Sequence, residues 1–541
     1  METVGLAERI FLPERVRRVA ILYEHREISY ADLQEAVSHA ADMLAGIGIS
    51  QGDRVAILLA DSPEFIALFI AIISLGAIAV PINLALRRDD QLFILNDCGA
   101  RAAVVEASVV NGLFANGLMP VSLVNLIVVQ RDSDGSIREV GDVKLQMFDD
   151  RTAPANRVIA DHRPADTNAD AFILYTSGST GEPKGAVHSQ GDIFYTNETY
   201  CREVLNLRDS DRLFSSSRLP FAYGLGNAFT FPLLNGCTAI LCREKPTAEV
   251  IARIFDEYRP TIFFGVPVVY RMLLEPHQAG VRVRASVGRS AGNGPTEVGA
   301  LKTGSLRLCI SAGEALPAAL GQEWQDMFDV QVLDGIGSTE MLHMWMSNHD
   351  GDVRYGSSGK LLHGYEARLI DHEDTAVAKG EVGNLWIRGG SAASRYWQRP
   401  DISAATFVDG WTRTGDLYRQ DADGFWWHMG RSDDCFKPTG QWVSPVEVEG
   451  VLLKSEHIRA AAVVEGFDKD GLSCVCAFIV RSDDDEIAKV EKSLRDLCES
   501  SLPRFKQPRR YIFIDELPYT ATGKVQRFKL REQLRAEKTG Q

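Results

Sequence analysis

The chain has 541 residues, enough for three to four folding units at ~150 residues each, which excludes a lone small binding module. Its 45% hydrophobic and 24% charged residues are typical of a globular protein and exclude wholesale disorder. A net charge of −15 repels phosphate backbones, so no nucleic acid is expected as a partner; residues 504–510 form the one short basic stretch.

Cysteine usage and the first residues predict a reduced protein of the cytoplasm. The nine cysteines are odd in number and scattered, and residues 1–18 contain no apolar core of a signal peptide. Residues 65–81 are uncharged and apolar, but Gly76 and Pro81 interrupt them, and the run is shorter than the ~20 residues that a membrane span needs. They predict a buried helix followed by a buried strand, and no membrane association is expected.

Helical patterns alternate with short apolar runs through most of the chain. A helix is predicted over 30–47, with Ser29 as its N-cap and Asp32 three residues later. Buried strands are predicted at 54–59, 102–105, 126–129 and 261–264. This alternation predicts an α/β fold with a large N-terminal lobe of several subdomains and layered sheets.

The segment AFILYTSGSTGEPKG, residues 171–185, is the most informative one. An apolar run leads into a loop with three glycines and four hydroxyl side chains, closed by Lys184, and a helical pattern begins at Asp192. Backbone N–H groups, hydroxyls and an ammonium suit a polyphosphate, and we expect them in a strand–loop–helix arrangement. Pro183 stands where a Walker A motif has its second glycine, so the loop is not of that type.

Two later regions differ from this pattern. Residues 281–305 are rich in Gly, Ser and Arg and predict a surface loop or insertion, which could also edge a substrate pocket. From about Asp433 a polar helix, two short strands at 460–464 and 474–480 and an amphipathic helix at 487–500 predict a compact α+β unit. The expected domains are therefore residues 1–432 and a mobile lid, residues 433–541.

Five further motifs follow the loop in order: SAGEALP (311–317), DGIGSTE (334–340), TGD (414–416), GRSDD (430–434) and PYTATGK (518–524). Together with the loop they resemble the adenylate-forming superfamily of acyl- and aryl-CoA synthetases, adenylation domains and luciferases. The resemblance implies an AMP-forming acid–thiol ligase that joins a carboxylate to the α-phosphate of ATP and then passes the acyl group to a thiol. It also implies ATP, Mg²⁺ and coenzyme A as cofactors.

The resemblance assigns a role to each matching residue. Thr339 matches the residue that contacts the α-phosphate, Glu340 the Mg²⁺ ligand, and Lys184 the cation of the phosphate loop. The other residues that match the phosphate loop are Thr176, Ser177, Gly178, Ser179, Thr180 and Gly181. The adenine ring is expected to lie against two segments, which are Ser311, Ala312, Gly313 and Glu314, and Asp334, Gly335, Ile336 and Gly337. Asp416 corresponds to the carboxylate that accepts both ribose hydroxyls, and Arg431 to a cation near the ribose and phosphate.

The C-terminal motifs imply domain alternation. Lys524 matches the lysine that reaches the acyl carboxylate and the bridging phosphate oxygen, and Asp433 matches the hinge about which the lid rotates. Lys437 and Gly440 match the loop that faces the thiol donor after rotation, whereas Pro438 and Thr439 depart from the family pattern.

Two stretches, FAYGLGN (221–227) and STEMLHMWMSN (338–348), resemble the benzoate-CoA ligase branch. Phe221, Ala222, Tyr223 and Gly224 offer small and aromatic side chains for a planar ring, and His343 is either a hydrogen-bond donor to the acid or a satisfied core histidine. The sequence predicts an aryl-CoA ligase acting on a small aromatic acid, as a monomer or homodimer. The alternatives are a ligase that loads a carrier-protein phosphopantetheine and a catalytically silent ligand-binding relative.

Overall fold

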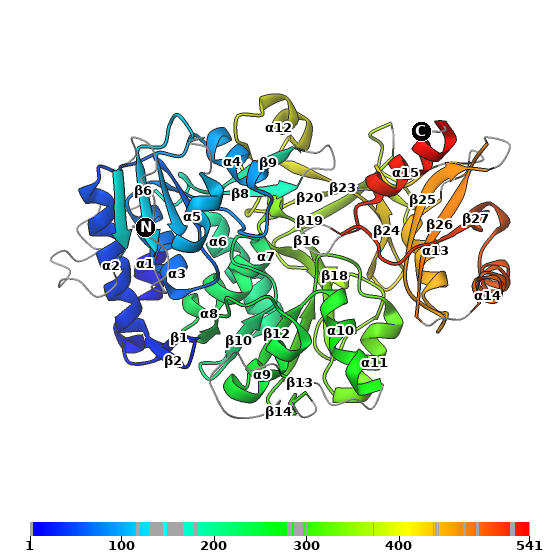
Figure 1. Cartoon of the computed structure of the whole chain (residues 1–541), viewed down its shortest axis with the longest axis horizontal. Helices are drawn as coiled ribbons and strands as arrows, with labels where there is room; N and C mark the ends of the chain where they lie inside the picture. The colour runs from blue at the N-terminus through cyan, green and yellow to red at the C-terminus, as the bar shows by residue number, and fades with distance from the viewer. Residues whose placement is uncertain are drawn as a thin grey trace.

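The structure is a computed structural model. It describes residues 4–114, 119–129, 144–148, 166–177, 182–278, 284–285, 296–297, 301–371, 373–436, 438, 441, 443–468, 472–482, 486–519 and 525–539. Figure 1 shows a large lobe that holds two of the sheets, and a smaller C-terminal unit at one end of the molecule.

An eight-stranded sheet carries the Ser/Gly loop of residues 176–184. In spatial order its strands are β21 (Arg395–Tyr396), β9 (Pro183–Ser189), β8 (Asp170–Ser177), β4 (Ile78–Pro81), β3 (Arg54–Leu58), β5 (Ala102–Glu106), β6 (Asn125–Val129) and β7 (Lys144–Phe148). The strands from β8 to β7 are parallel, whereas β9 and β21 are antiparallel to their neighbours. Three of the strands predicted from apolar runs are β3, β5 and β6 of this sheet, and the fourth is β12 (Ile262–Gly265) of the second sheet. Each predicted strand agrees with the structure within two residues at each end.

A nine-stranded sheet forms the second layer. In spatial order its strands are β18 (Lys360–Leu361), β17 (Met344–Ser347), β16 (Val332–Gly337), β15 (Leu308–Ser311), β12 (Ile262–Gly265), β10 (Arg212–Ser215), β11 (Thr238–Ile240), β1 (Val19–Tyr23) and β2 (Arg26–Ser29). The six strands from β16 to β1 are parallel. In open sheets of this kind, ligands bind at the carboxyl ends of the parallel strands.

The helices fill the space between the layers and cover their outer faces. They are α1 (Leu6–Ile10), α2 (Tyr30–Gly46), α3 (Pro63–Ser74), α4 (Arg88–Asp97), α5 (Ala107–Leu113), α6 (Gln190–Thr196), α7 (Ala222–Leu225), α8 (Phe231–Leu234), α9 (Ala248–Tyr258), α10 (Pro267–Gln278), α11 (Ala318–Phe328) and α12 (Pro400–Thr406). Two 3-10 turns are η1 (Pro13–Arg15) and η6 (Thr339–Met341), and two π-helical segments are η4 (Asn197–Leu205) and η5 (Gly226–Thr230).

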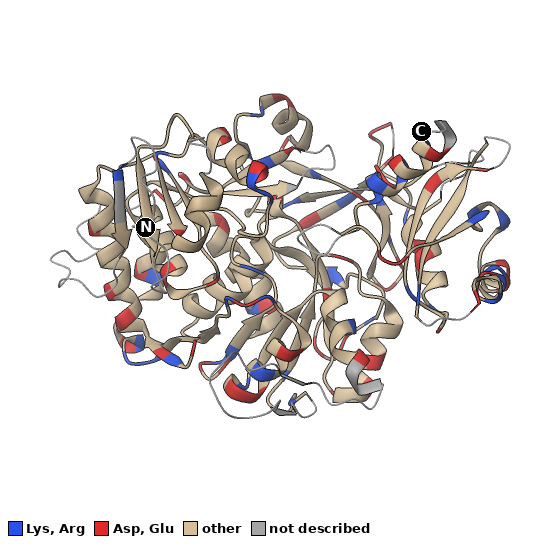
Figure 2. Cartoon of the chain, in the orientation of Figure 1, with Lys and Arg blue, Asp and Glu red and all other residues tan. Residues whose placement is uncertain are grey.

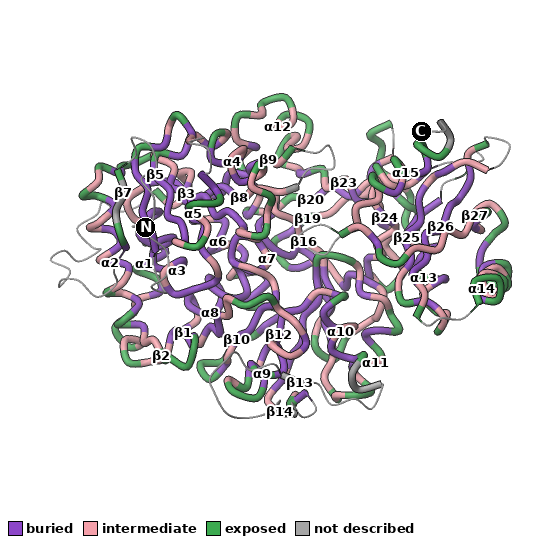
Figure 3. Tube along the Cα trace, in the orientation of Figure 1, coloured by how far each residue is buried: buried purple, intermediate pink, exposed green. Residues whose placement is uncertain are grey.

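The largest core cluster joins the two sheets through α3. It contains residues of β3, β4 and β8 from one sheet and of β1 and β11 from the other, with ten residues of α3 buried between them. Figure 3 shows buried residues running along the strands of both layers. The prediction that residues 65–81 are a buried helix and strand is confirmed, since they contain most of α3 and all of β4. Within the described ranges, no helix is both long and apolar enough to cross a membrane.

A five-stranded sheet links the lobe to the C-terminal unit. It contains β19 (Glu366–Ile370), β20 (Gly383–Arg388), β23 (Trp411–Gln420) and β22 (Phe407–Val408), with β24 (Trp426–Arg431) paired to β23. The C-terminal unit has β25 (Ile458–Phe467), β26 (Ser473–Arg481) and β27 (Arg510–Phe513), with α13 (Pro445–Leu452), α14 (Ile487–Ser501), η7 (Arg504–Lys506) and α15 (Arg527–Thr539). The predicted fold class, a layered α/β lobe followed by a small α+β unit, is confirmed.

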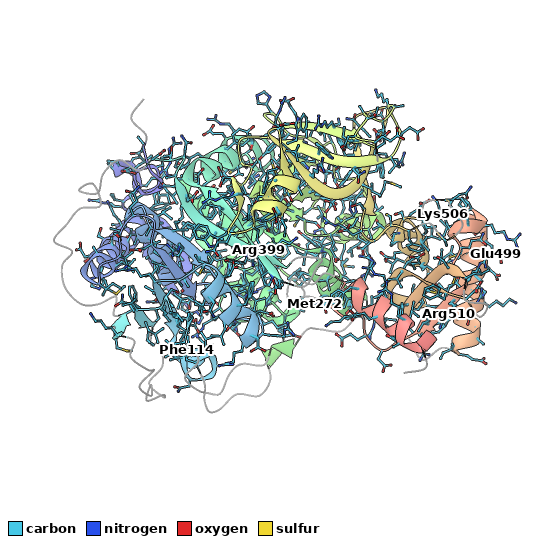
Figure 4. All side chains as sticks on the ribbon, turned by 90° about the horizontal axis from the view of Figure 1, so that it is seen from above. Phe114, Met272, Arg399, Glu499, Lys506 and Arg510 are labelled. Atoms are coloured by element: carbon cyan, nitrogen blue, oxygen red, sulfur yellow. The ribbon has the colours of Figure 1, made fainter. Side chains whose placement is uncertain are left out.

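The basic stretch at 504–510 is used inside the C-terminal unit. Lys506 pairs with Glu447 at 2.6 Å and Arg510 with Glu537 at 3.0 Å. Figure 4 places Lys506 and Arg510 on this unit, away from Arg399 in the large lobe. In the view of Figure 2, Lys and Arg alternate with Asp and Glu over the exposed helices and loops, so the net charge is spread over this surface.

In the segment 281–305, the structure describes residues 284–285, 296–297 and 301–305. Two short strands, β13 (Arg284–Ala285) and β14 (Thr296–Glu297), pair antiparallel there. The rest of the predicted insertion lies outside the described residues.

Candidate active site

Three parallel strands bring the predicted adenine segments together. The register pairs Gly265 of β12 with Ser311 of β15, and Ser311 with Asp334 of β16. Gly265 and Ser311 end their strands, and Asp334 ends the part of β16 that pairs with β15. Residues 311–314 follow β15 directly, and Gly335, Ile336 and Gly337 finish β16. The sheet therefore builds one edge from two motifs that are separated in the sequence.

The Ser/Gly loop differs from the arrangement expected from the sequence. It joins β8 to the antiparallel strand β9, with Thr176 opposite Lys184 and Ser177 opposite Pro183. The expected strand–loop–helix is therefore wrong: the loop is a hairpin, and α6 begins only after β9. β9 pairs antiparallel with β8, and its residues 185–188 are buried. Gly178, Ser179, Thr180 and Gly181 lie outside the described residues, and so does the side chain of Ser177.

The base of the loop is tied to neighbouring elements. The Tyr175 hydroxyl at the end of β8 donates to Asp97 Oδ2 at 2.6 Å, and Arg399 donates to Asp97 Oδ1 at 2.8 Å. Burial is the main cause that raises the pKa of Tyr175 well above its ordinary value, so its proton stays in place for this bond. These contacts fix the direction in which β8 enters the loop.

One tyrosine brings Lys184 and Glu340 together. The Tyr396 hydroxyl of β21 donates to Glu340 Oε1 at 2.7 Å, and the Lys184 Nζ lies 5.9 Å from the centre of the Tyr396 ring. The edge of the eight-stranded sheet thus meets η6, which follows β16 of the nine-stranded sheet. The predicted phosphate-loop cation and the predicted metal ligand therefore converge although 156 positions separate them, from 184 to 340.

Asp416 and Arg431 form a pair on adjacent strands. The register places them opposite each other on β23 and β24, and Arg431 Nη1 lies 3.3 Å from Asp416 Oδ1. His428 Nε2 lies 3.5 Å from the same oxygen. Gly415 has φ +74°, and a Cβ there would lie 2.8 Å from the Arg431 guanidinium, so glycine allows the arginine to approach.

Arg431 is the centre of a group of carboxylates. Burial lowers the pKa of its guanidinium, but three neighbouring carboxylates outweigh burial and raise it. They belong to Asp416, Asp433 and Glu340. The structure therefore brings the predicted ribose, hinge and metal residues around one cation.

Asp334 acts as a buried clamp between the two adenine segments. Its Oδ2 accepts a hydrogen bond from the Leu316 backbone N–H at 3.2 Å, and burial raises its pKa to about 8. The sequence placed Asp334 only among the residues expected against the adenine; the structure adds a side-chain role that holds Leu316 against β16.

The raised pKa predicts a pH-dependent effect of Asp334→Asn. The folded chain keeps the Asp334 proton where the unfolded chain, with an ordinary pKa of 3.8, loses it. The wild type is therefore destabilised relative to the variant as pH rises from about 4 to about 8, by up to about 1.4 kcal/mol per pH unit. We expect the Tm of D334N minus that of the wild type to increase over this range. Asp326→Asn, on the exposed face of α11, controls for the loss of one negative charge, and a pH-independent difference for D334N would contradict the raised pKa of Asp334.

Two of the predicted aryl-acid residues, Tyr223 and His343, meet in an aromatic cluster that also contains Tyr200 and Phe231, which were not predicted. The His343 ring centre lies 5.7 Å from that of Tyr223, 4.7 Å from that of Tyr200 and 4.7 Å from that of Phe231. Burial lowers the pKa of His343 to about 3, so its ring is neutral. Among the described residues neither of its nitrogens makes a hydrogen bond of normal geometry, although the Tyr223 backbone is close enough to oppose the effect of burial on the pKa. This favours a ring that can bond to a ligand over the satisfied core histidine left open by the sequence.

Glycine serves close packing in this cluster. A Cβ at Gly226 would lie 2.6 Å from the His343 ring, and a Cβ at Gly224 would overlap the Arg218 carbonyl. Phe221 and Ala222 begin α7 at this point, after β10. The backbone of Ser217 and Arg218 therefore occupies the position next to Gly224. The glycine that lies against the His343 ring is Gly226.

The C-terminal unit approaches the large lobe beside Glu314. Tyr519 and Val525 form an isolated bridge that brackets residues 520–524, and burial together with the charge of Glu314 raises the pKa of Tyr519. Lys524 itself lies outside the described residues, as do Lys437 and Gly440. Both ends of the Lys524 loop are nevertheless placed near the 311–317 segment.

The predicted hinge lies directly after β24. Asp433 is in the turn that follows Arg431, and its neighbour Asp434 pairs with Arg531 at 2.9 Å and with Arg527 at 3.7 Å. The two neighbouring carboxylates therefore interact with different parts of the molecule. Asp433 acts on Arg431 of β24, whereas Asp434 pairs with Arg531 of α15 in the C-terminal unit.

Sequence reasoning missed three residues of this region: His188, Tyr200 and Tyr396. His188 Nε2 lies 2.8 Å from the Thr339 carbonyl oxygen, and Tyr396 holds Glu340. Tyr200 is buried on η4, far from any motif. The chain order offered no signal for these contacts, because each joins segments that only the packing of the two sheets brings together.

Family models and curated relatives match this chain over most of its length. A family model described as AMP-binding enzyme matches residues 12–397, and one described as AMP-binding enzyme C-terminal domain matches residues 447–524. The benzoate–CoA ligase of Thauera aromatica is 38% identical over 97% of this chain and 94% of that protein. The 4-hydroxybenzoate–CoA/benzoate–CoA ligase of Rhodopseudomonas palustris is 36% identical over 98% of this chain and 93% of that protein.

Solved structures are similar as well. The crystal structure of an anthranilate CoA ligase in complex with anthranoyl-AMP aligns with a TM-score of 0.84 and 33% identity, over 99% of this chain and 98% of that one. A benzoate CoA ligase from Burkholderia xenovorans aligns with a TM-score of 0.82 and 34% identity, over 97% of this chain and 99% of that one.

Proposed function

The chain belongs to the AMP-binding enzyme family, and on that premise we propose that it is an ATP-dependent aryl-CoA ligase. It adenylates a benzoate-like carboxylic acid, releases pyrophosphate, and transfers the acyl group to coenzyme A with release of AMP. The observation that carries this proposal is the aromatic cluster around neutral His343, which lies three positions after Glu340. A planar acid bound there would have its carboxylate near Thr339 and Glu340, which are expected to contact the phosphates of ATP and Mg²⁺.

Charge neutralisation is the main task of the first step, because a carboxylate must approach a polyanion. Lys184 and Arg431 supply positive charge from two different sheets, and Lys524 would supply a third from the lid. Thr339 would donate its hydroxyl to the α-phosphate. The cations stabilise the charge that gathers on the phosphate oxygens as the acid attacks.

Glu340 fits a magnesium site. Its carboxylate is half-buried and one oxygen is fixed by Tyr396, and Mg²⁺ prefers one or two carboxylates together with phosphate oxygens. Among the described residues, no group of three or more His, Cys, Asp or Glu forms a closed metal site. When bound with ATP, Mg²⁺ would neutralise charge on the phosphates, while Tyr396 keeps the Glu340 carboxylate directed at them.

The nucleotide would lie along the carboxyl ends of β15 and β16. Residues 311–314 and 334–337 offer backbone to the adenine, and the Asp416 carboxylate would accept the two ribose hydroxyls. Asp416 is buried beside Arg431 and His428, so its charge is kept in place for this role.

The aromatic acid would lie between α7 and the strand that follows His343. Phe221, Ala222 and Tyr223 would line its ring, and the free nitrogens of His343 would donate to or accept from a substituent or the carboxylate. Because the imidazole is neutral, it would act through hydrogen bonds and not through charge.

The second step is assigned to the lid, residues 433–541. Rotation about Asp433 would withdraw Lys524 and bring the loop with Lys437 and Gly440 towards the thiol of coenzyme A. The placement of Tyr519 beside Glu314 supports the adenylation arrangement for the conformation described.

Product analysis tests this function. We expect aryl-CoA, AMP and pyrophosphate in equal amounts when purified enzyme receives ATP, Mg²⁺, coenzyme A and an acid from a panel of benzoate, hydroxybenzoates, aminobenzoates, cinnamate and naphthoates. A parallel reaction contains a carrier protein with phosphopantetheine in place of coenzyme A. Acyl transfer to the carrier protein alone, or a preference for a linear fatty acid, would contradict the proposal.

A further inference from the structure

The turn that presents Thr339 and Glu340 is strained. Leu342, at its end, has φ +63°, a conformation that side chains other than glycine rarely adopt. The His343 N–H donates to the Met341 carbonyl at 2.7 Å, which closes a tight three-residue turn around Leu342. Strain of this kind persists only where the surroundings hold it, and it often marks a functional site.

Three consecutive carbonyls of this turn accept hydrogen bonds from outside it. The Glu340 carbonyl accepts from the Ala393 N–H at 2.7 Å, and the Met341 carbonyl accepts from the Ser391 hydroxyl at 2.8 Å. The Thr339 carbonyl accepts from His188 Nε2 at 2.8 Å. Two of these donors precede β21, and the third is an imidazole on β9.

His188 is well fixed for this contact. Its side chain is fully buried, its ring stacks on Phe172 with centres 5.3 Å apart, and its Nδ1 lies 2.7 Å from Asp192 Oδ2. A carbonyl oxygen can only accept, so Nε2 is the donor to Thr339, while Nδ1 faces the Asp192 carboxylate. Lys184 and His188 are four residues apart on β9 and therefore point to the same face of the sheet.

We propose that His188 is a positioning residue of the adenylation site: its Nε2–H fixes the Thr339–Glu340 peptide so that the Thr339 hydroxyl and the Glu340 carboxylate face ATP. The inference rests on the proposed function, since it concerns the residues that would bind the phosphates. Asp192 orients the imidazole, and Phe172 holds its plane. The role acts through Thr339 and Glu340, without contact between His188 and substrate.

Two substitutions separate the two hydrogen bonds of His188. The side-chain amide of Gln can replace Nε2 and donate to Thr339, while that of Asn replaces Nδ1 and keeps only the bond to Asp192. Both lose the stacking on Phe172 equally, so they are matched. We expect H188N to lower kcat for adenylation about 10²-fold, as a displacement of about 1 Å at a reacting group can, and H188Q to retain most of it.

The readouts distinguish positioning from a merely structural role. The KM for the aromatic acid should stay unchanged in both variants, because the cluster around His343 is not altered. By calorimetry, H188N should bind a non-reactive benzoyl sulfamoyl adenosine, which mimics the acyl-adenylate, more weakly than the wild type, and H188Q should bind it as tightly. Thr247→Ala, which removes the N-cap of α9 and has no contact with His188 or Asp192 among those described, should lower Tm without changing kcat.

Each other outcome overturns the inference. Equal losses in H188N and H188Q would show that only burial and stacking matter, and a larger loss in H188Q would assign the effect to Asp192. If H188N does not fold, a large loss of kcat in folded H188Q still refutes the role. A wild type that adenylates no aromatic acid would instead refute the proposed function, which is a separate result.

Discussion

Lys524→Ala is expected to lower the rate of adenylate formation by about 10²–10³-fold, while thioester formation from preformed aryl-adenylate largely survives. The ammonium would stabilise negative charge only while carboxylate and phosphate approach each other. The bridge between Tyr519 and Val525 holds the ends of its loop beside the large lobe. Single-turnover assays of the two half-reactions measure the two rates separately.

Lys529→Ala is the matched control, because Lys529 is a nearby exposed lysine on α15. It should leave both half-reactions unchanged. If Lys524→Ala slowed both half-reactions equally, the proposal that rotation of the lid about Asp433 separates adenylation from thioester formation would be contradicted.

Glu340→Gln should reduce adenylation by a similar factor, about 10²–10³-fold, because the amide keeps the shape and can still accept from Tyr396 but carries no charge. We expect the loss to be partly recovered at high Mg²⁺ concentration, since a weaker ligand demands more metal. The rate at increasing Mg²⁺ and fixed ATP measures this effect.

Tyr396→Phe is the comparison for Glu340→Gln. It keeps the ring beside Lys184 and removes only the hydroxyl that holds Glu340, so its loss should be smaller. A Glu340→Gln enzyme with wild-type rate at every Mg²⁺ concentration would remove Glu340 from the metal site.

The sequence assigned Lys184, Glu340, Asp416 and Arg431 to the site because the motifs around them resemble those of the adenylate-forming superfamily. The structure brings these four residues together through Tyr396 and the β23–β24 pair. Their roles towards phosphate, metal and ribose remain predictions. The α/β class followed from apolar runs, since parallel strands are buried on both faces.

The rest depended on contacts that join distant segments. His188 meets Thr339 across 151 positions, and Tyr396 meets Glu340 across 56, with no spacing that could predict either contact. The hairpin of the Ser/Gly loop was missed because β9 contains only two apolar residues, Ala186 and Val187, and so does not show the apolar run by which the other strands were predicted. The role of Gly226 became visible only when the His343 ring was placed against it.

The most direct test of the proposed function is exchange of labelled pyrophosphate into ATP by the wild-type enzyme, with Mg²⁺ and benzoate but without coenzyme A. This reaction isolates adenylation, the step in which Lys184, Thr339, Glu340 and Lys524 are assigned roles. The account predicts exchange that depends on benzoate or a ring-substituted benzoate and that exceeds exchange with a linear fatty acid. Exchange with the fatty acid alone, or none with any aromatic acid, would contradict it.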